Sequence, residues 1–171
     1  GKNEIAIGAS NGRMVRFDEN EIRSMGRSSS GVKGIELEGA VVVGAEVVNP
    51  GQYILIVTEK GYGKKTLIDE YRLTHRGSKG VKTLNSTDKT GNIVAFKVVS
   101  DLEDLMIITD SVMVIRIPIS QVSRTSRVTQ GVRLISLKDN QKVTSVFNIP
   151  KEDNEDEMTG STDEVQIKEA E

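Results

Sequence analysis

The 171-residue sequence contains no cysteine and no tryptophan, and its aromatic residues are three tyrosines and three phenylalanines. Without cysteine, neither a disulfide framework nor a thiolate zinc site can form, and a reducing compartment suits the chain. No apolar run approaches the roughly 20 residues of a membrane span, and the start GKNEIAIGAS lacks the hydrophobic region of a signal peptide. These absences predict a soluble cytoplasmic protein without a membrane partner.

Charge is divided unequally along the chain. Residues 151–171 hold nine carboxylates and two lysines, a net charge of −7, whereas residues 1–150 hold 21 basic and 16 acidic side chains, a net charge of +5. Because so polar a segment cannot build a core, we expect residues 151–171 to form a disordered acidic tail. The basic body is about one domain long and favours a polyanionic partner, for which the tail would compete.

Three similar segments of about fifty residues follow one another in the body. Shifting the sequence by 49 and by 100 residues aligns IAIGASNGRMVRF from Ile5 with ILIVTEKGYGKKT from Ile54 and LMIITDSVMVIRI from Leu105. The same shifts align EIRSMGRSSSGVKGIEL, EYRLTHRGSKGVKTL and QVSRTSRVTQGVRLISL further along each segment. Repeats of this length indicate a propeller-like architecture, in which each blade buries its faces against its neighbours.

Each repeat has the pattern of strands separated by turns. It opens on an apolar, β-branched run that suits a buried inner strand, and a turn then leads into a strand that carries cations. The first turn has the strong hairpin signal Asn11-Gly12, whereas the third has Val112 at the glycine position. No segment shows a helical period. The sequence therefore predicts an all-β, propeller-like fold of three four-stranded blades, at about 1–50, 51–102 and 103–150, too few to close a ring.

Basic residues recur at three places in every repeat. The first cation column contains Arg16, Lys65 and Arg116, the second contains Arg27, Arg76 and Arg127, and the third contains Lys33, Lys82 and Arg133. Charged residues usually form a solvated rim, but repetition of all three columns favours contact with a polyanion. A Gly-Val pair precedes each third-column cation, at Gly31, Gly80 and Gly131. This glycine either needs a positive φ or a close backbone approach, or it marks an ordinary turn entering a strand.

Duplex DNA is the polyanion that this pattern favours. Around the edge of a disc, the columns would form a curved track that contacts phosphates, so sequence would matter only through the cost of bending. Six aromatic residues are too few for a platform that stacks single-stranded bases. The alternative is a propeller-type protein-interaction scaffold whose basic rim binds an acidic protein, and duplex bending separates the two hypotheses.

Several segments resemble the C-terminal domain of the DNA gyrase A subunit, over about residues 4–150. They are VRFDENEIRSMGRSSSGVKGIEL, TEKGYGKKTLIDEYR, THRGSKGVK and ITDSVMVIRIPISQVSRTSRVTQGVRLISL. The resemblance implies the last three blades of a β-pinwheel, a six-bladed disc whose neighbouring blades exchange strands. It also implies a non-catalytic module that wraps duplex DNA and supports ATP-dependent negative supercoiling by a type II topoisomerase. The implied partners are duplex DNA, the rest of the gyrase A polypeptide and, through it, the gyrase B polypeptide, near a bacterial nucleoid.

The resemblance assigns DNA wrapping to the cations of the three columns and to one lysine beside Gly80. These residues are Arg16, Arg27, Lys33, Lys65, Arg76, Lys79, Lys82, Arg116, Arg127 and Arg133. The basic box of the family belongs to the first blade of the disc, and HRGSKG at residues 75–80 matches this motif only in part. Supercoiling by this chain alone is therefore not implied. The corresponding C-terminal module of topoisomerase IV is the alternative within the family.

The sequence predicts no catalytic residue, cofactor site or metal site. The enzymes of the resemblance attack a phosphodiester with a tyrosine, but Tyr53, Tyr62 and Tyr71 match no such motif. His75 has no serine or cysteine partner in a recognisable nucleophile context. GYGKKT lacks the spacing of a phosphate loop, and EDNEDE lacks the glycine of a calcium loop. ATP and Mg²⁺ would be used elsewhere in the complete enzyme.

Overall fold

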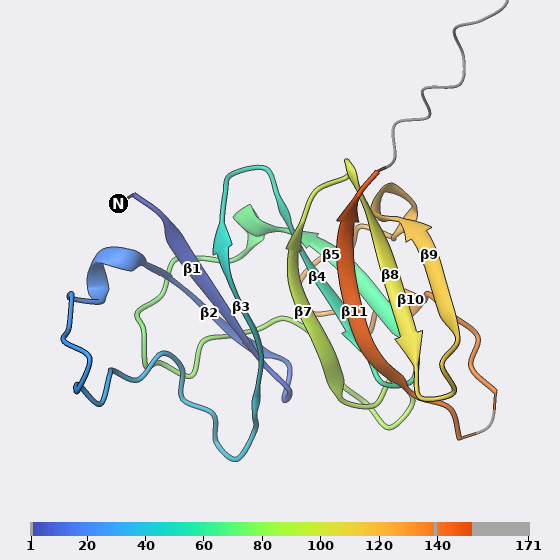
Figure 1. Cartoon of the computed structure of the whole chain (residues 1–171), viewed down its shortest axis with the longest axis horizontal. Helices are drawn as coiled ribbons and strands as arrows, with labels where there is room; N and C mark the ends of the chain where they lie inside the picture. The colour runs from blue at the N-terminus through green and yellow to red at the C-terminus, as the bar shows by residue number, and fades with distance from the viewer. Residues whose placement is uncertain (1, 139, 152–171) are drawn as a thin grey trace, which may run out of the picture.

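The computed structural model describes residues 2–138 and 140–151, so the acidic tail predicted from the sequence lies outside the described residues from position 152 onward. Eleven strands in this part form three antiparallel sheets, which stand beside one another in a row (Figure 1). The remaining regular elements are three short 3₁₀ helices. The predicted all-β fold is confirmed. Among these residues, no helix is long and apolar enough to cross a membrane.

Blade 1 takes its outermost strand from the second repeat. Across the sheet the order is β3 (Val42–Val48), β1 (Glu4–Ala9), β2 (Arg13–Asp18) and β6 (Val81–Lys82). β2 continues into the 3₁₀ helix η1 (Glu19–Glu21), where the Asp18 carboxylate caps the turn by accepting from the Asn20 N–H at 2.7 Å. The sheet is therefore complete only when two repeats are present.

Blade 2 repeats this arrangement with a strand from the third repeat. Its order is β7 (Ile93–Val99), β4 (Tyr53–Thr58), β5 (Tyr62–Leu67) and β10 (Val132–Arg133), and η2 (Ile68–Glu70) follows β5. The strand exchange that the resemblance implied is thus present twice.

Blade 3 has three strands in the described part of the chain. They are β11 (Val143–Pro150), β8 (Glu103–Thr109) and β9 (Val114–Pro118), and η3 (Ile119–Gln121) follows β9. The prediction of four strands is correct for blades 1 and 2 but not for this sheet. The outermost strand of blades 1 and 2 comes from the following repeat, and the described residues contain no such strand for blade 3.

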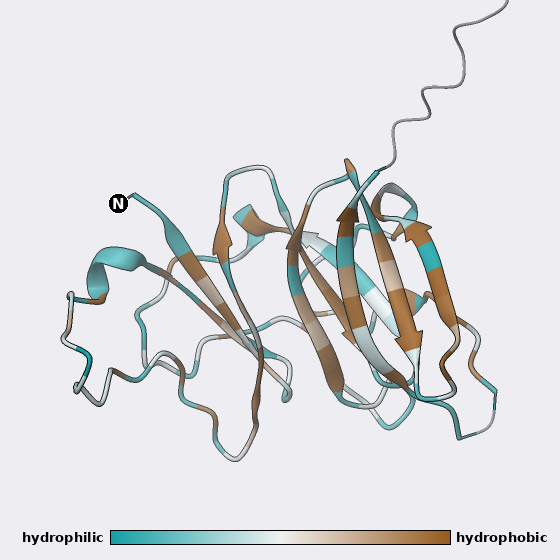
Figure 2. Ribbon diagram, in the orientation of Figure 1, coloured by the Kyte–Doolittle hydropathy of each residue, from teal (hydrophilic) through white to brown (hydrophobic). Residues whose placement is uncertain are grey.

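The hydrophobic core lies between the sheets. Ala6 and Met14 of blade 1 pack with Ile54 and Ile56 of blade 2, and the opposite face of β4 packs against blade 3 through Leu55. Alternate residues of one strand therefore contact different neighbours, and the apolar strands of Figure 2 follow this row of sheets. Complete burial of one such aliphatic side chain stabilises a fold by roughly 1.5–3 kcal/mol.

The third hairpin turn differs from the first two. Gly12 and Gly61 have φ angles of 81° and 80°, and Val112 adopts a φ of 62° at the corresponding position. A β-carbon on Gly61 would lie 2.8 Å from the carbonyl oxygen of Ile135, in the following repeat. Val112 is instead 80% exposed. The turn of blade 3 thus has room for a side chain, although its backbone conformation still favours glycine.

Candidate nucleic-acid interface

The third cation column lies on the outermost strands of the blades. Lys82 belongs to β6 and Arg133 to β10, and both residues are exposed. Lys33 is also exposed, outside any strand, and its ammonium pairs with Glu36 at 2.6 Å. Strand exchange therefore places the Gly-Val-cation motif of one repeat on the rim of the preceding blade.

In blades 1 and 2, the cation of the first column joins the blade to the next one. The Arg16 guanidinium is 15% exposed and donates Nη1–H bonds to the carbonyl oxygens of Ile68 and Tyr71 at 3.0 and 2.8 Å, while its Nε pairs with Glu4 at 2.5 Å. These carbonyls belong to η2 and its C-cap in the second repeat. A guanidinium that satisfies two carbonyl groups at a helix end ties the two blades together.

Lys65 makes the same kind of contact one blade further along. Its ammonium is 5% exposed, donates to the Ile119 carbonyl at 2.8 Å and pairs with Asp101 at 2.5 Å. The bond from Lys65 lowers the pKa of the Asp101 carboxyl below its ordinary value. In blade 3, Arg116 pairs with Asp104 at 2.8 Å. Two members of this column thus contact the 3₁₀ helix of the following repeat, not solvent.

The second cation column also contacts backbone in a neighbouring repeat. Arg76 donates from Nη1 to the carbonyl oxygen of Lys33 at 3.3 Å and from Nε to that of Glu21 at 3.0 Å. Arg127 donates from Nη1 to the carbonyl oxygen of Lys82 at 3.0 Å. Each guanidinium therefore fixes the backbone of the third-column cation in the preceding repeat. The side chain of that cation remains at the surface. Arg27 is exposed.

The glycine of the Gly-Val-cation motif has a positive φ in all three repeats and a close backbone approach in the second and third. Gly80 and Gly131 have φ angles of 68° and 77°. A β-carbon on Gly131 would lie 2.6 Å from the carbonyl oxygen of Gly63, and one on Gly80 would clash with the carbonyl of Met14. Gly31 has a φ of 78°, but a β-carbon there would meet nothing within 4 Å in the described structure. The glycine thus lets each exchanged strand approach the preceding blade.

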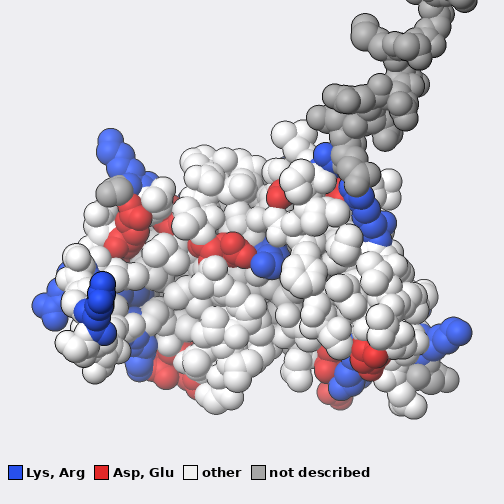
Figure 3. Space-filling view, in the orientation of Figure 1, with Lys and Arg blue, Asp and Glu red and all other residues white. Residues whose placement is uncertain are grey.

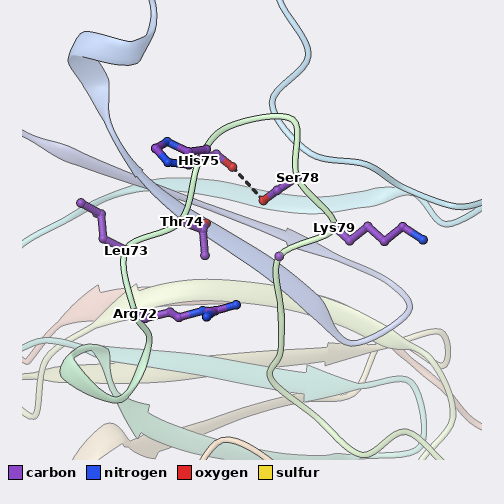
Figure 4. Close-up of a pocket in the computed structure, with 7 residues that line it drawn as sticks. Arg72, Leu73, Thr74, His75, Ser78 and Lys79 are labelled. Atoms are coloured by element: carbon purple, nitrogen blue, oxygen red, sulfur yellow. Dashed lines mark hydrogen bonds between the residues drawn. The ribbon is translucent and has the colours of Figure 1, made fainter.

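Residues 72–80, which include the partial match to the basic box, form a loop around an open hollow of about 390 Å³ (Figure 4). Arg72 extends between the two arms of the loop, whereas Lys79 extends outward and pairs with Glu38. The His75 ring lies 3.2 Å from the Glu21 carboxylate, and Gly77 N–H donates to the Gly34 carbonyl at 2.6 Å. The loop is therefore fixed against the first repeat.

One basic side chain that the columns do not include, Arg13, also lies near the rim. Arg13 is paired directly with Lys82 in the two-residue ladder between β2 and β6. Like charges in this position repel each other unless an anion or solvent screens them. In blade 2, Arg133 faces Tyr62 instead. The alignment of the three repeats did not reveal Arg13, because the equivalent positions hold Tyr62 and Met113 and no column of cations is visible there.

Lys64, beside the first column, is completely buried. Its ammonium donates to the Ser126 carbonyl at 2.8 Å and to the Arg127 carbonyl, and burial lowers its pKa to about 8. The corresponding residues Val15 and Ile115 are apolar, which was a signal in the sequence for a core position. Lys64 therefore supports the second cation column from inside the blade.

The tyrosines occupy packing positions in the described part of the chain. Tyr71 is buried and its hydroxyl hydrogen-bonds with Thr83, and burial raises the pKa of its phenol. The Tyr53 ring lies 5.0 Å from the Lys65 ammonium. Between residues 2 and 151, position 139 aside, no three His, Asp or Glu side chains gather as a metal site.

Figure 3 shows one face of the molecule. Uncharged side chains cover much of its middle, and lysines and arginines lie mainly toward its margins, where acidic side chains are interspersed. The charged side chains on this face therefore do not form one continuous basic surface.

Three comparisons place the fold among known proteins. A family model described as "DNA gyrase C-terminal domain, beta-propeller" matches residues 3–49, 52–100 and 103–150. The DNA gyrase A subunit of Ureaplasma parvum serovar 3 is 52% identical over 147 residues, and that of Staphylococcus aureus is 44% identical over 169 residues. These alignments cover 85% and 95% of the chain, which spans 18% and 19% of these much longer relatives.

Two solved domains have similar structures. A C-terminal domain of DNA topoisomerase IV matches with a TM-score of 0.82 and 26% identity, over 88% of this chain and 47% of that domain. A DNA gyrase A C-terminal domain matches with a TM-score of 0.79 and 26% identity, over 86% of this chain and 50% of that domain. Three repeats thus correspond to about half of each solved domain.

Proposed function

The chain belongs to the DNA gyrase C-terminal domain family, and on this premise we propose that it binds duplex DNA along the outermost strands of its blades and bends it. The observation that carries the proposal is the position of Lys82 and Arg133, which lie exposed at equivalent places on β6 and β10. Cations spaced in this way contact phosphates and position a duplex without reading its bases.

The proposed contacts are a subset of the cations that the sequence suggested. They are the exposed side chains Arg27, Lys33, Lys79, Lys82 and Arg133. Lys33 and Lys79 pair with exposed carboxylates, but such surface pairs are weak and can be exchanged for a phosphate. We assign Arg16, Lys65, Arg76 and Arg127 to a different role, in which they hold the blades at a fixed spacing through backbone carbonyls.

The larger context of this activity is also a proposal. The module would wrap DNA as part of a gyrase A polypeptide, near the nucleoid, together with the gyrase B polypeptide in an ATP-dependent type II topoisomerase. Catalysis and the use of ATP and Mg²⁺ would then lie in other parts of that assembly. The similarity to a C-terminal domain of topoisomerase IV keeps a role in that enzyme as the alternative context.

A long duplex labelled at both ends tests the proposal, because affinity and end-to-end distance are read together across a salt series. If about five phosphates are neutralised, log affinity should fall with log salt at a slope of roughly −4 to −5, and the labelled ends should approach. The double variant Lys82→Gln, Arg133→Gln should reduce the slope by about two. Binding that is independent of salt and leaves the duplex straight would favour the protein-interaction scaffold instead.

A further inference from the structure

A basic cavity of about 460 Å³ lies at the tip of the β4–β5 hairpin in blade 2. The residues that matter for its chemistry are Lys60, Tyr62, Lys89, Arg133 and Lys142. They come from the hairpin, from the segment before β7 and from the third repeat. Strand exchange therefore assembles the cavity from two repeats.

Tyr62 lies close to two of these cations. The Arg133 guanidinium donates an Nη2–H bond to the Tyr62 hydroxyl oxygen at 3.2 Å, and its central carbon lies 5.6 Å from the centre of the ring. The Lys89 ammonium also lies 5.6 Å from the ring centre. The bond from Arg133 lowers the pKa of the Tyr62 phenol below its ordinary value. The hydroxyl thus sits in a positive environment.

The positive charge of this cavity is only partly compensated. Lys142 pairs with Glu59 at 3.1 Å, and Lys60 donates to the Asp88 carbonyl oxygen. Neither Lys89 nor Arg133 has an ion-pair partner among residues 2–138 and 140–151. Two cations and one hydroxyl donor therefore face the same cavity without a carboxylate between them.

We propose that this cavity is a phosphate-binding site, in which one phosphate accepts hydrogen bonds from Lys89, Arg133 and the Tyr62 hydroxyl. Guanidinium and ammonium groups are the usual partners of phosphate oxygens, and the phenol adds a neutral donor of fixed position. The identification of the phosphate as part of a duplex rests on the proposed function. A free inorganic phosphate presents the same oxygens.

The site would give blade 2 a role that the other blades lack. At the position of Tyr62, the first repeat has Arg13 and the third has Met113. Lys82 and Arg133 lie at the rims of blades 1 and 2, but only in blade 2 would Tyr62 and Lys89 join the third-column cation in binding one phosphate. A duplex bound along the rim would then be anchored at blade 2.

Ring resonances of isotopically labelled tyrosine test the site, because the chain has only three tyrosines. The Tyr62 resonance should shift when a duplex is added, and the Tyr53 resonance should not. Tyr62→Phe should lower duplex affinity about three- to tenfold with an unchanged salt slope, because a hydrogen bond to a charged group is lost. Lys89→Gln should lower affinity and reduce the slope by about one. Tyr53→Phe is the matched control and should bind as the unmodified chain does.

The outcomes separate this inference from the proposed function. If Lys82→Gln weakens duplex binding but Tyr62→Phe and Lys89→Gln do not, and the Tyr62 resonance stays in place, the phosphate site is wrong and the proposed function stands. If no duplex binds but inorganic phosphate shifts the Tyr62 resonance, the site is supported with a free anion as its ligand. If neither ligand moves that resonance, the site is overturned.

Discussion

The α-carbon of Gly80 lies against the backbone carbonyl of Met14, so that no β-carbon fits between the two residues. This contact brings β6, from the second repeat, onto the edge of β2 in the first. Gly31 occupies the same position of the first repeat, with a similar φ but with open space around it. Comparing Gly80 with Gly31 therefore separates the loss of stability caused by a strained backbone from the loss caused by a steric clash.

We expect Gly80→Ala to lower the free energy of unfolding by more than about 2 kcal/mol, because alanine must adopt a left-handed conformation and displace a backbone carbonyl. Gly31→Ala should cost only about 1 kcal/mol, from the conformation alone. Urea unfolding of both variants measures the difference. Equal losses would show that β6 does not pack on β2 as closely as described.

Val112→Gly should stabilise the protein by about 0.5–1 kcal/mol. The left-handed conformation costs an L-residue roughly 1–2 kcal/mol, and the greater freedom of glycine in the unfolded chain offsets part of the gain. Gly61→Ala, at the equivalent turn of blade 2, should destabilise it because Ile135 blocks the β-carbon. Thermal unfolding of the two variants should therefore move the midpoint in opposite directions, and a lower midpoint for Val112→Gly would contradict the assigned turn.

We expect Arg16 to act on stability and Lys82 on DNA binding, although each belongs to a column of cations that recurs in all three repeats. Arg16→Met removes bonds to two carbonyl groups and should cost about 2–3 kcal/mol of stability, while the salt slope of DNA binding by the folded protein stays unchanged. Lys82→Gln should change stability by less than about 0.5 kcal/mol and reduce the slope by about one. The opposite pattern would return Arg16 to the DNA interface.

The buried Lys64 makes stability depend on pH in alkaline solution. Its folded pKa of about 8 lies below the ordinary value of 10.5, so the unfolded chain binds more protons between these two pH values. The free energy of unfolding should therefore rise from about pH 8 toward pH 9.5. In Lys64→Met this contribution should be missing. Urea unfolding of both proteins across this range checks the sign, and an identical pH dependence would refute it.

The sequence predicted the strands well because their apolar runs repeat. Ile5, Ile54 and Leu105 open equivalent inner strands, and the Gly-Val pair before Lys82 and Arg133 marks the exchanged strand. The hairpin at Val112 was also recognisable, although its glycine is missing. These features depend on local side-chain pattern, which an internal alignment reveals directly.

Whether a cationic side chain contacts a backbone carbonyl or extends into solvent could not be predicted in the same way. Arg16 and Arg76 donate to backbone carbonyls, and a carbonyl leaves no trace in the amino-acid sequence because every residue has one. The same alignment column therefore fits an inter-blade contact and a phosphate contact equally well. The cavity at Tyr62 was not predictable for a related reason, since its residues come from two repeats and Tyr62 and Lys89 do not recur in the other repeats.

Strand exchange also has a consequence for the order of events during synthesis. The partners Arg13 and Lys82, like Tyr62 and Arg133, are about 70 residues apart in the chain. At roughly 5–20 residues per second, a ribosome needs several seconds to supply the strand that covers the rim of the preceding blade. Blades 1 and 2 therefore emerge with one edge uncovered, and each is completed by a strand of the next repeat, so that chain growth sets the order in which these blades are completed.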